Sequence, residues 1–117
     1  MKDIEELEAV VKALSSKKAE KITALKIKDI TSLANYFVIA SGTSSTQVKA
    51  LADEVEYQLG QKGVKPHGID GSPSSNWIAL DYIDVVVHIF HEEAREFYQL
   101  EHLWADGEPV DISEWDK

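Results

Sequence analysis

The chain has 117 residues, a formal net charge of −9 and no cysteine. This length suffices for one hydrophobic core and is too short for two, so residues 1–117 are expected to form a single domain. The lack of cysteine excludes disulfides and thiolate metal sites and favours a cytoplasmic location. The acidic first residues and short apolar runs indicate neither export nor a membrane span.

The net negative charge comes entirely from the C-terminal third of the chain. Residues 1–80 contain ten lysines and ten acidic residues, whereas residues 81–117 contain eleven acidic residues against Arg95 and Lys117. Such a one-sided negative field repels nucleic acid and attracts basic protein surfaces. We therefore expect a basic macromolecular partner and no direct nucleic-acid binding, with solubility as the simpler explanation of the same charge.

The first half of the chain predicts two helices and two strands. Asp3 and Glu6 form a capping pattern before a helix of about four turns, whose apolar face is formed by Ile4, Leu7, Val11 and Leu14. Residues 21–30 and 36–40 have the composition of strands. Ser44 and Gln47 form a second capping pattern, and helical spacing from Val48 to Leu59 predicts a helix that ends at Gly60 and Gly63.

The second half predicts three strands, a helix and an irregular tail. Residues 64–69 read as a short strand and 70–75 as a turn, followed by a hairpin of strands 76–81 and 84–90. Residues 91–104 are expected to be helical and 105–117 irregular. Strands that alternate with helices indicate an α/β fold with a mixed sheet.

The hairpin is the predicted working surface. If Asp81 pairs with Asp84, side-chain alternation puts Leu80, Val85, Ile78, Val87 and Ile89 on an apolar face beneath helices. The other face then carries Trp77 opposite His88, Ala79 opposite Val86, and Phe90. This mixed composition predicts a partly open face. An Asp81–Asp84 pair is destabilising unless a basic side chain neutralises it, although turn-flanking acids can also simply diverge into water.

Other roles compete with binding to a basic partner. The Ser41-Gly42-Thr43-Ser44 turn between a strand and a helix can hold an anion, and it resembles the opening motif of nucleotidyltransferases. Those enzymes carry two metal-binding carboxylates on the next strand, whereas Asp53, Glu54 and Glu56 fall within a helix. The histidines also lack the spacing of a metal site. We therefore expect no catalytic activity, no cofactor and no bound metal. A nucleotide-using transferase and a homodimer that buries Trp77 against Phe90 remain the alternatives.

Four blocks of sequence, residues 35–42, 47–50, 77–82 and 84–95, together resemble the ribosomal silencing factor family RsfS, also called the Iojap or YbeB family. The resemblance spans nearly the whole chain. It implies a nucleotidyltransferase-like fold without transferase activity. It further implies binding to the large ribosomal subunit through ribosomal protein L-fourteen, which blocks joining of the small subunit and represses translation when nutrients are limiting.

The resemblance also assigns the surface that would contact the partner. It implies aromatic anchors at Trp77 and Tyr82 and partners for Lys or Arg at Asp81, Asp84 and Glu92. The same surface is expected to include His88, Glu93 and Arg95. The family often has glycine where this chain has Ile83. Since a β-branched residue resists positive φ, we expect a wider turn or one of another type.

Overall fold

The computed structural model describes residues 3–27, 34–71, 76–92 and 107–116. Two helices in this part of the chain, α1 (Asp3–Ser16) and α2 (Ser45–Gln61), pack on a six-stranded sheet. The strands are β1 (Glu20–Lys26), β2 (Tyr36–Gly42), β3 (Gly68–Gly71), β4 (Trp77–Asp81), β5 (Val85–His91) and β6 (Glu108–Pro109).

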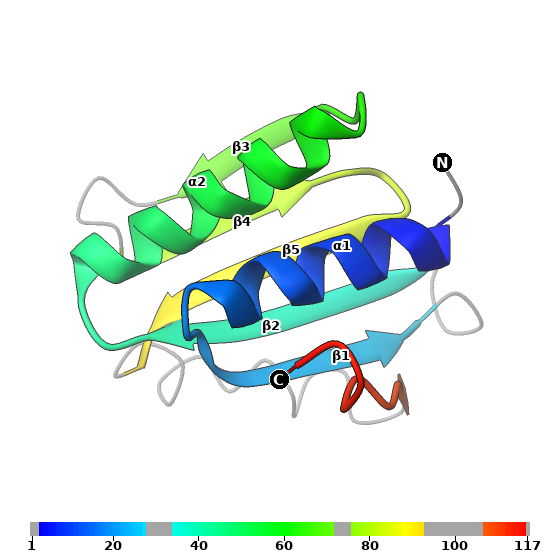
Figure 1. Cartoon of the computed structure of the whole chain (residues 1–117), viewed down its shortest axis with the longest axis horizontal. Helices are drawn as coiled ribbons and strands as arrows, with labels where there is room; N and C mark the ends of the chain where they lie inside the picture. The colour runs from blue at the N-terminus through cyan, green and yellow to red at the C-terminus, as the bar shows by residue number, and fades with distance from the viewer. Residues whose placement is uncertain (1–2, 28–33, 72–75, 93–106, 117) are drawn as a thin grey trace.

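The sheet is mixed, as predicted. Its strand order is β3-β4-β5-β2-β1-β6, and β2 pairs with β5 in parallel while the other neighbours are antiparallel. Helix α2 runs back along the sheet after β2, which lets a later strand, β5, pair with β2 in parallel at the centre (Figure 1). This arrangement confirms the α/β class.

Helix α1 forms because its apolar residues recur on one face. Leu7, Val11 and Leu14 are fully buried as predicted, and Val10 joins them. Ile4 differs from the prediction, because its side chain is 40% exposed at the first turn of the helix. The apolar stripe therefore begins one turn later than the sequence pattern suggests.

Helix α2 begins at the predicted cap. The Ser44 side-chain oxygen accepts a hydrogen bond from the Gln47 N–H at 3.1 Å. The Gln47 side chain turns back, and its Oε1 accepts from the Thr43 N–H at 2.6 Å. These bonds satisfy backbone donors that the start of a helix leaves without partners, so the cap fixes where β2 ends and α2 begins.

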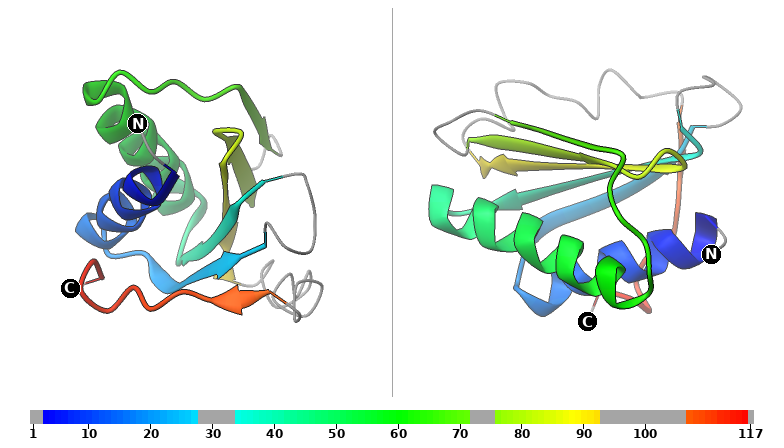
Figure 2. Two further views of the ribbon diagram at one scale, coloured as in Figure 1. Left: turned by 90° about the vertical axis from the view of Figure 1, so that its right-hand side faces the viewer. Right: turned by 90° about the horizontal axis from the view of Figure 1, so that it is seen from above.

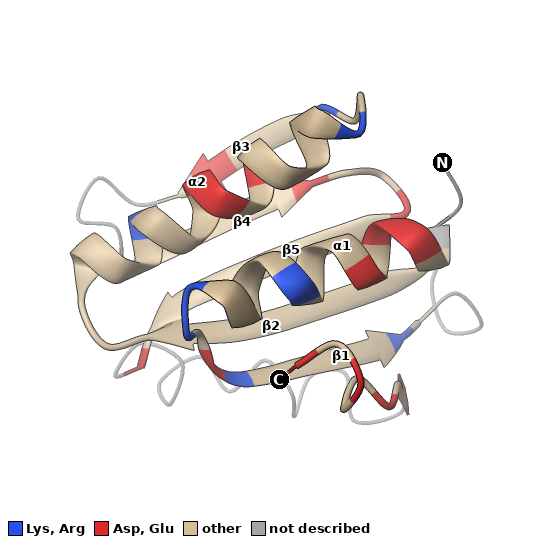
Figure 3. Ribbon diagram, in the orientation of Figure 1, with Lys and Arg blue, Asp and Glu red and all other residues tan. Residues whose placement is uncertain are grey.

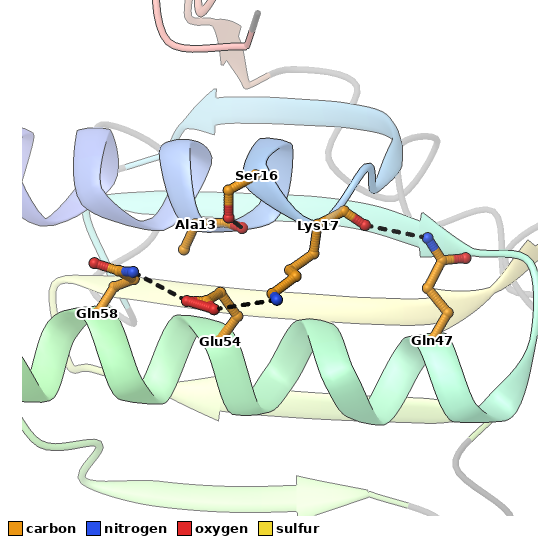
Figure 4. Close-up of polar contacts among 6 residues, drawn as sticks. All are labelled: Ala13, Ser16, Lys17, Gln47, Glu54 and Gln58. Atoms are coloured by element: carbon orange, nitrogen blue, oxygen red, sulfur yellow. Dashed lines mark hydrogen bonds and ion pairs between the residues drawn. The ribbon is translucent and has the colours of Figure 1, made fainter.

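Polar contacts join α2 to the end of α1 (Figure 4). Glu54 lies 3.8 Å from the Lys17 ammonium and accepts a 3.0 Å hydrogen bond from Gln58, while Gln47 Nε2 donates to the Lys17 carbonyl at 3.4 Å. A partly exposed ion pair of this kind contributes at most about 1 kcal/mol. The shared apolar core, in which α2 buries Val48, Leu51, Ala52, Val55 and Leu59, therefore supplies most of the helix docking.

Several segments differ from the sequence-based prediction. Strand β1 ends at Lys26, short of the predicted residue 30, and β2 continues through Ser41 and Gly42, which were predicted to end it. Strand β3 covers 68–71 where 64–69 was predicted, so Asp70 and Gly71 belong to a strand instead of a turn. In the tail, Glu108 and Pro109 pair with β1 at the outer edge, where the missing proline N–H breaks no ladder bond. The predicted turn over 72–75 and most of the predicted helix over 91–104 lie outside the described residues.

Candidate partner-binding surface

The two faces of the sheet differ because α1 and α2 lie on the same side of it (Figure 2). On that side, the side chains of the β4–β5 hairpin are fully buried at Leu80, Val85, Val87 and Ile89. These are four of the five residues that alternation assigned to the apolar face, and the fifth, Ile78, is partly buried and packs against the same core. The prediction of which hairpin face packs beneath the helices is therefore confirmed.

The opposite face is graded from buried to open across the sheet. Near β1 and β2 it carries a second apolar cluster, formed by Leu25, Ile27, Ala34 and Phe37, and on β5 Phe90 is only 2% exposed. Towards β4 the side chains of Trp77, Ala79 and Asp81 are half-buried, and on β3 all residues are exposed. The open part of this face is therefore its β3–β4 side.

The predicted hairpin register is wrong by two residues. Trp77 lies opposite Phe90 instead of His88, and Asp81 lies opposite Val86 instead of Asp84. The chain turns later than expected, since the Tyr82 N–H donates to the Val85 carbonyl at 2.9 Å and leaves Ile83 and Asp84 as the turn residues. A shift of two keeps every side chain on its face, so the face assignment survives while the repulsive Asp81–Asp84 cross-strand pair does not.

The new register brings a different acidic residue next to Asp81. Asp70 of β3 lies opposite Ala79, and Gly68 lies opposite Asp81. Asp70 and Asp81 are therefore diagonal neighbours on the open side, at the roughly 7–8 Å typical of such positions. We call Asp70 and Asp81 the acidic edge. Sequence reasoning missed Asp70 because its Gly- and Ser-rich neighbourhood indicates a turn, and only β3 pairing reveals its face.

The β4–β5 turn is tight, so of the two alternatives expected there, a wider turn or one of another type, the wider turn is wrong. Ile83 adopts a positive φ of 73°, the Asp84 N–H donates to the Tyr82 carbonyl at 2.9 Å, and Asp81 Oδ1 accepts from the Ile83 N–H at 2.8 Å. This i to i+2 bond with positive φ is a γ-turn. For an L-residue with a β-branch, the conformation costs about 1–2 kcal/mol, which the surrounding hydrogen bonds must offset.

His88 holds Trp77 in place on the partly open face. The Trp77 indole N–H donates to His88 Nδ1 at 3.2 Å, and their rings stack with centroids 6.2 Å apart and planes within 13°. Burial lowers the pKa of His88 to about 4, so the imidazole is neutral near pH 7 and Nδ1 can accept. His88 is thus a hydrogen-bonded sheet residue that orients the indole, and at neutral pH it offers a partner no positive charge.

Phe90 contributes to the same aromatic stack from within. Its ring lies 6.4 Å from Trp77, to which it is paired across the hairpin. Because Phe90 is almost fully buried in a single chain, it has little surface with which to meet the Trp77 of a second copy. The predicted Trp77–Phe90 contact across a two-fold axis is therefore replaced by a contact inside the chain.

Tyr82 lies inside the protein, although the sequence suggested an aromatic anchor for a partner. Its side chain is 4% exposed, and it packs in the core beneath the helices. Burial, together with the nearby carboxylates Glu56 and Glu6, raises the pKa of the Tyr82 phenol to about 12. In this position the ring supports the turn from below and has little surface for contact.

The remaining predicted site residues surround the turn or lie outside the described part. The Asp84 carbonyl accepts hydrogen bonds from the N–H groups of Asn35 at 2.9 Å and Tyr36 at 3.0 Å, which fixes its backbone against β2. Glu92 is exposed just after β5. Glu93 and Arg95 lie outside the described residues. Figure 3 shows acidic residues on both sides of the β4–β5 turn and over the first turns of α1.

The turn that resembles a nucleotidyltransferase motif is occupied by the chain itself. The Thr43 N–H and hydroxyl both donate to Gln47 Oε1, at 2.6 and 2.8 Å, so these donors are not free for a phosphate.

A groove of about 330 Å³ lies between the helices and is lined by Ala9, Lys12, Ala13, Ser16, Gln58 and Lys62. Within the described ranges, no three His, Asp or Glu side chains are grouped to hold a metal ion.

The whole chain matches a known family. Residues 1–117 match the family model described as ribosomal silencing factor during starvation. The chain belongs to the RsfS family. Its curated relatives include the ribosomal silencing factors RsfS of Halalkalibacterium halodurans, 38% identical over 96% of both chains, and of Bacillus subtilis, 38% identical over 91% of this chain and 90% of the relative. Family membership confirms the resemblance seen in the sequence.

Relatives and solved structures extend this RsfS-family assignment. The chloroplastic protein Iojap of Zea mays is 29% identical over 89% of this chain and 45% of its own length. A crystal structure of a Chromobacterium violaceum protein superposes with a TM-score of 0.87 at 36% identity and covers 90% of this chain and 88% of the other.

Among the described residues, α1 and α2 are too short or too polar to cross a membrane.

Proposed function

We propose that this RsfS-family protein binds the large ribosomal subunit through ribosomal protein L-fourteen and prevents the small subunit from joining. Translation would then fall when nutrients are scarce. The action is steric, so it needs an exposed, complementary surface and no reacting group. We propose the cytoplasm as its compartment, in keeping with the lack of cysteine.

The observation that carries the proposal is the acidic, aromatic surface on the open β3–β4 side of the sheet. Half-buried Trp77 offers a rigid apolar contact held by His88 at the start of β4. The acidic edge supplies negative charge along β3 and β4, and Asp84 adds to it at the β4–β5 turn. Aromatic anchors with surrounding charges are typical of binding surfaces, and carboxylates at such a surface select basic partners. The position of Glu92 after β5 is compatible with the same use.

A subunit-joining experiment tests this function. Purified large subunits are incubated with the protein, small subunits are added, and whole ribosomes are measured by sedimentation. We expect fewer whole ribosomes as the protein concentration rises, and co-sedimentation of the protein with large subunits. Binding without an effect on joining would contradict the steric mechanism, and absence of binding would contradict the partner itself.

Whether the free protein forms a homodimer is independent of ribosome binding. A dimer would have to use a contact other than Trp77 against Phe90, because Phe90 is buried within one chain. Sedimentation equilibrium at several protein concentrations measures the oligomeric state directly. A molecular mass that stays at that of one chain over the whole range would contradict dimerisation.

A further inference from the structure

Ile83 combines two features that rarely occur together in one residue. Its side chain is 59% exposed, and its backbone has a positive φ of 73°. In the part of the chain that the structure describes, the other non-glycine residues with positive φ are Lys18 and Lys21, whose side chains are polar. Ile83 is therefore an apolar, β-branched side chain displayed to solvent by a conformation that disfavours it.

The turn around Ile83 is held rigidly. Asp81 Oδ1 accepts the Ile83 N–H at 2.8 Å, the Tyr82 N–H donates to Val85 at 2.9 Å, and the Asp84 carbonyl accepts two bonds from the start of β2. Buried Tyr82 packs beneath it. The isoleucine side chain itself takes little part in this support, since most of it faces solvent. The fold would accept glycine or asparagine here more easily, so folding does not explain the isoleucine.

We propose that Ile83 is an apolar anchor that inserts into a hydrophobic depression on the large-subunit partner, bordered by basic side chains. This inference rests on the proposed function. The basic border follows from the charges on either side of the turn, because Asp81 and Asp84 flank Ile83 in the chain. A rigid turn loses little conformational freedom when its tip is buried in a partner, which favours binding.

The test compares two substitutions that separate the apolar contact from the turn geometry. Affinity for isolated large ribosomal subunits is measured for the unsubstituted protein, for Ile83→Asn and for Ile83→Leu. Asparagine adopts positive φ readily but is polar, so we expect about a tenfold rise in Kd with unchanged or higher Tm. Leucine keeps the apolar side chain without the β-branch, so its Kd should remain within about twofold.

Lys18→Asn is the matched control, because it places the same residue type at another exposed position of positive φ, after the end of α1. It should leave Kd unchanged. If Ile83→Asn binds as tightly as the unsubstituted protein, the anchor is overturned while the proposed function stands. If Ile83→Leu weakens binding as much as Ile83→Asn, then an apolar side chain at this position is not sufficient for binding. That result would also overturn the proposed anchor. If the unsubstituted protein does not bind large subunits, both proposals fail.

Discussion

The two faces of the β4–β5 hairpin belong to the same strands but bury their side chains very differently. Beneath α1 and α2, Leu80 and its neighbours on β5 are fully buried, whereas on the opposite face burial decreases from Phe90 towards Asp81 and Asp70. The first face is under the demands of core packing, which penalises any polar or misfitting group. The second face can carry aromatic and acidic side chains that folding does not need. Stability and partner binding should therefore be separable by mutation.

The largest effect is expected from the helix-covered face. Leu80→Ala should lower the free energy of unfolding by about 3 kcal/mol, since it removes a fully buried side chain and leaves a cavity. Urea denaturation measures this change. Asp70→Asn on the opposite, exposed side is the control and should change it by less than about 0.5 kcal/mol. Equal losses in the two variants would break the distinction between the faces.

The buried part of the second face should respond to acid. The pKa of His88 lies near 4 in the folded protein and near 6.5 when unfolded, because burial disfavours the charged ring. Between these pH values the unfolded chain binds more protons, so stability is present above about pH 6.5 and falls as the pH drops towards 4. At most about 3 kcal/mol would be lost over this window.

Urea denaturation at a series of pH values measures this contribution, and His88→Gln should flatten the acid limb. His67→Gln serves as the control, since His67 is exposed just before β3. An acid limb that is identical in the His88→Gln variant would show that His88 is as accessible to protons as an unfolded residue.

The acidic part of the second face should act on binding and not on folding. Asp84 makes its hydrogen bonds through backbone atoms, so Asp84→Lys reverses a charge without removing them. We expect Kd for large subunits to rise about tenfold at low salt, with little change in Tm. The loss should shrink as salt screens the interaction. Asp53→Lys on the exposed side of α2 makes the same change in net charge and should bind normally.

Asp81 needs a different design because Oδ1 also accepts from the Ile83 N–H. Asp81→Asn keeps an oxygen acceptor at this position and removes the charge. If binding depends on charge, Asp81→Asn should weaken it by a few-fold and leave Tm nearly unchanged. A large fall in Tm would instead show that the carboxylate serves the turn.

The smallest effect is expected at Tyr82. No described residue accepts a hydrogen bond from its buried hydroxyl, so Tyr82→Phe should be neutral or stabilising by up to about 1 kcal/mol. The variant should also abolish the loss of stability between pH 10 and about 12 that a raised phenol pKa implies. Because the ring is buried, binding to large subunits should be unchanged. Weaker binding would restore Tyr82 as a contact residue.

Much of the fold follows from local patterns in the sequence. The apolar spacing of α1, the Ser44–Gln47 cap of α2 and the alternation in β4 and β5 each act over a few residues, and the structure confirms them. Alternation also assigned the correct faces despite the wrong register, because a shift of two residues preserves side-chain parity. The family followed from blocks of residues that are specific in their order.

Contacts between distant segments were decided only by the tertiary structure. The hairpin register depends on a turn in which Ile83 adopts positive φ, a conformation that its β-branch argues against. The Ile83 N–H donates to Asp81 Oδ1 and the Asp84 N–H donates to the Tyr82 carbonyl, and these two bonds maintain the turn. The acidic edge exists only because β3 pairs with β4, and Tyr82 is buried only because both helices pack over its side of the sheet. Local propensity cannot encode such placements, since they depend on the packing of segments that are far apart in the chain.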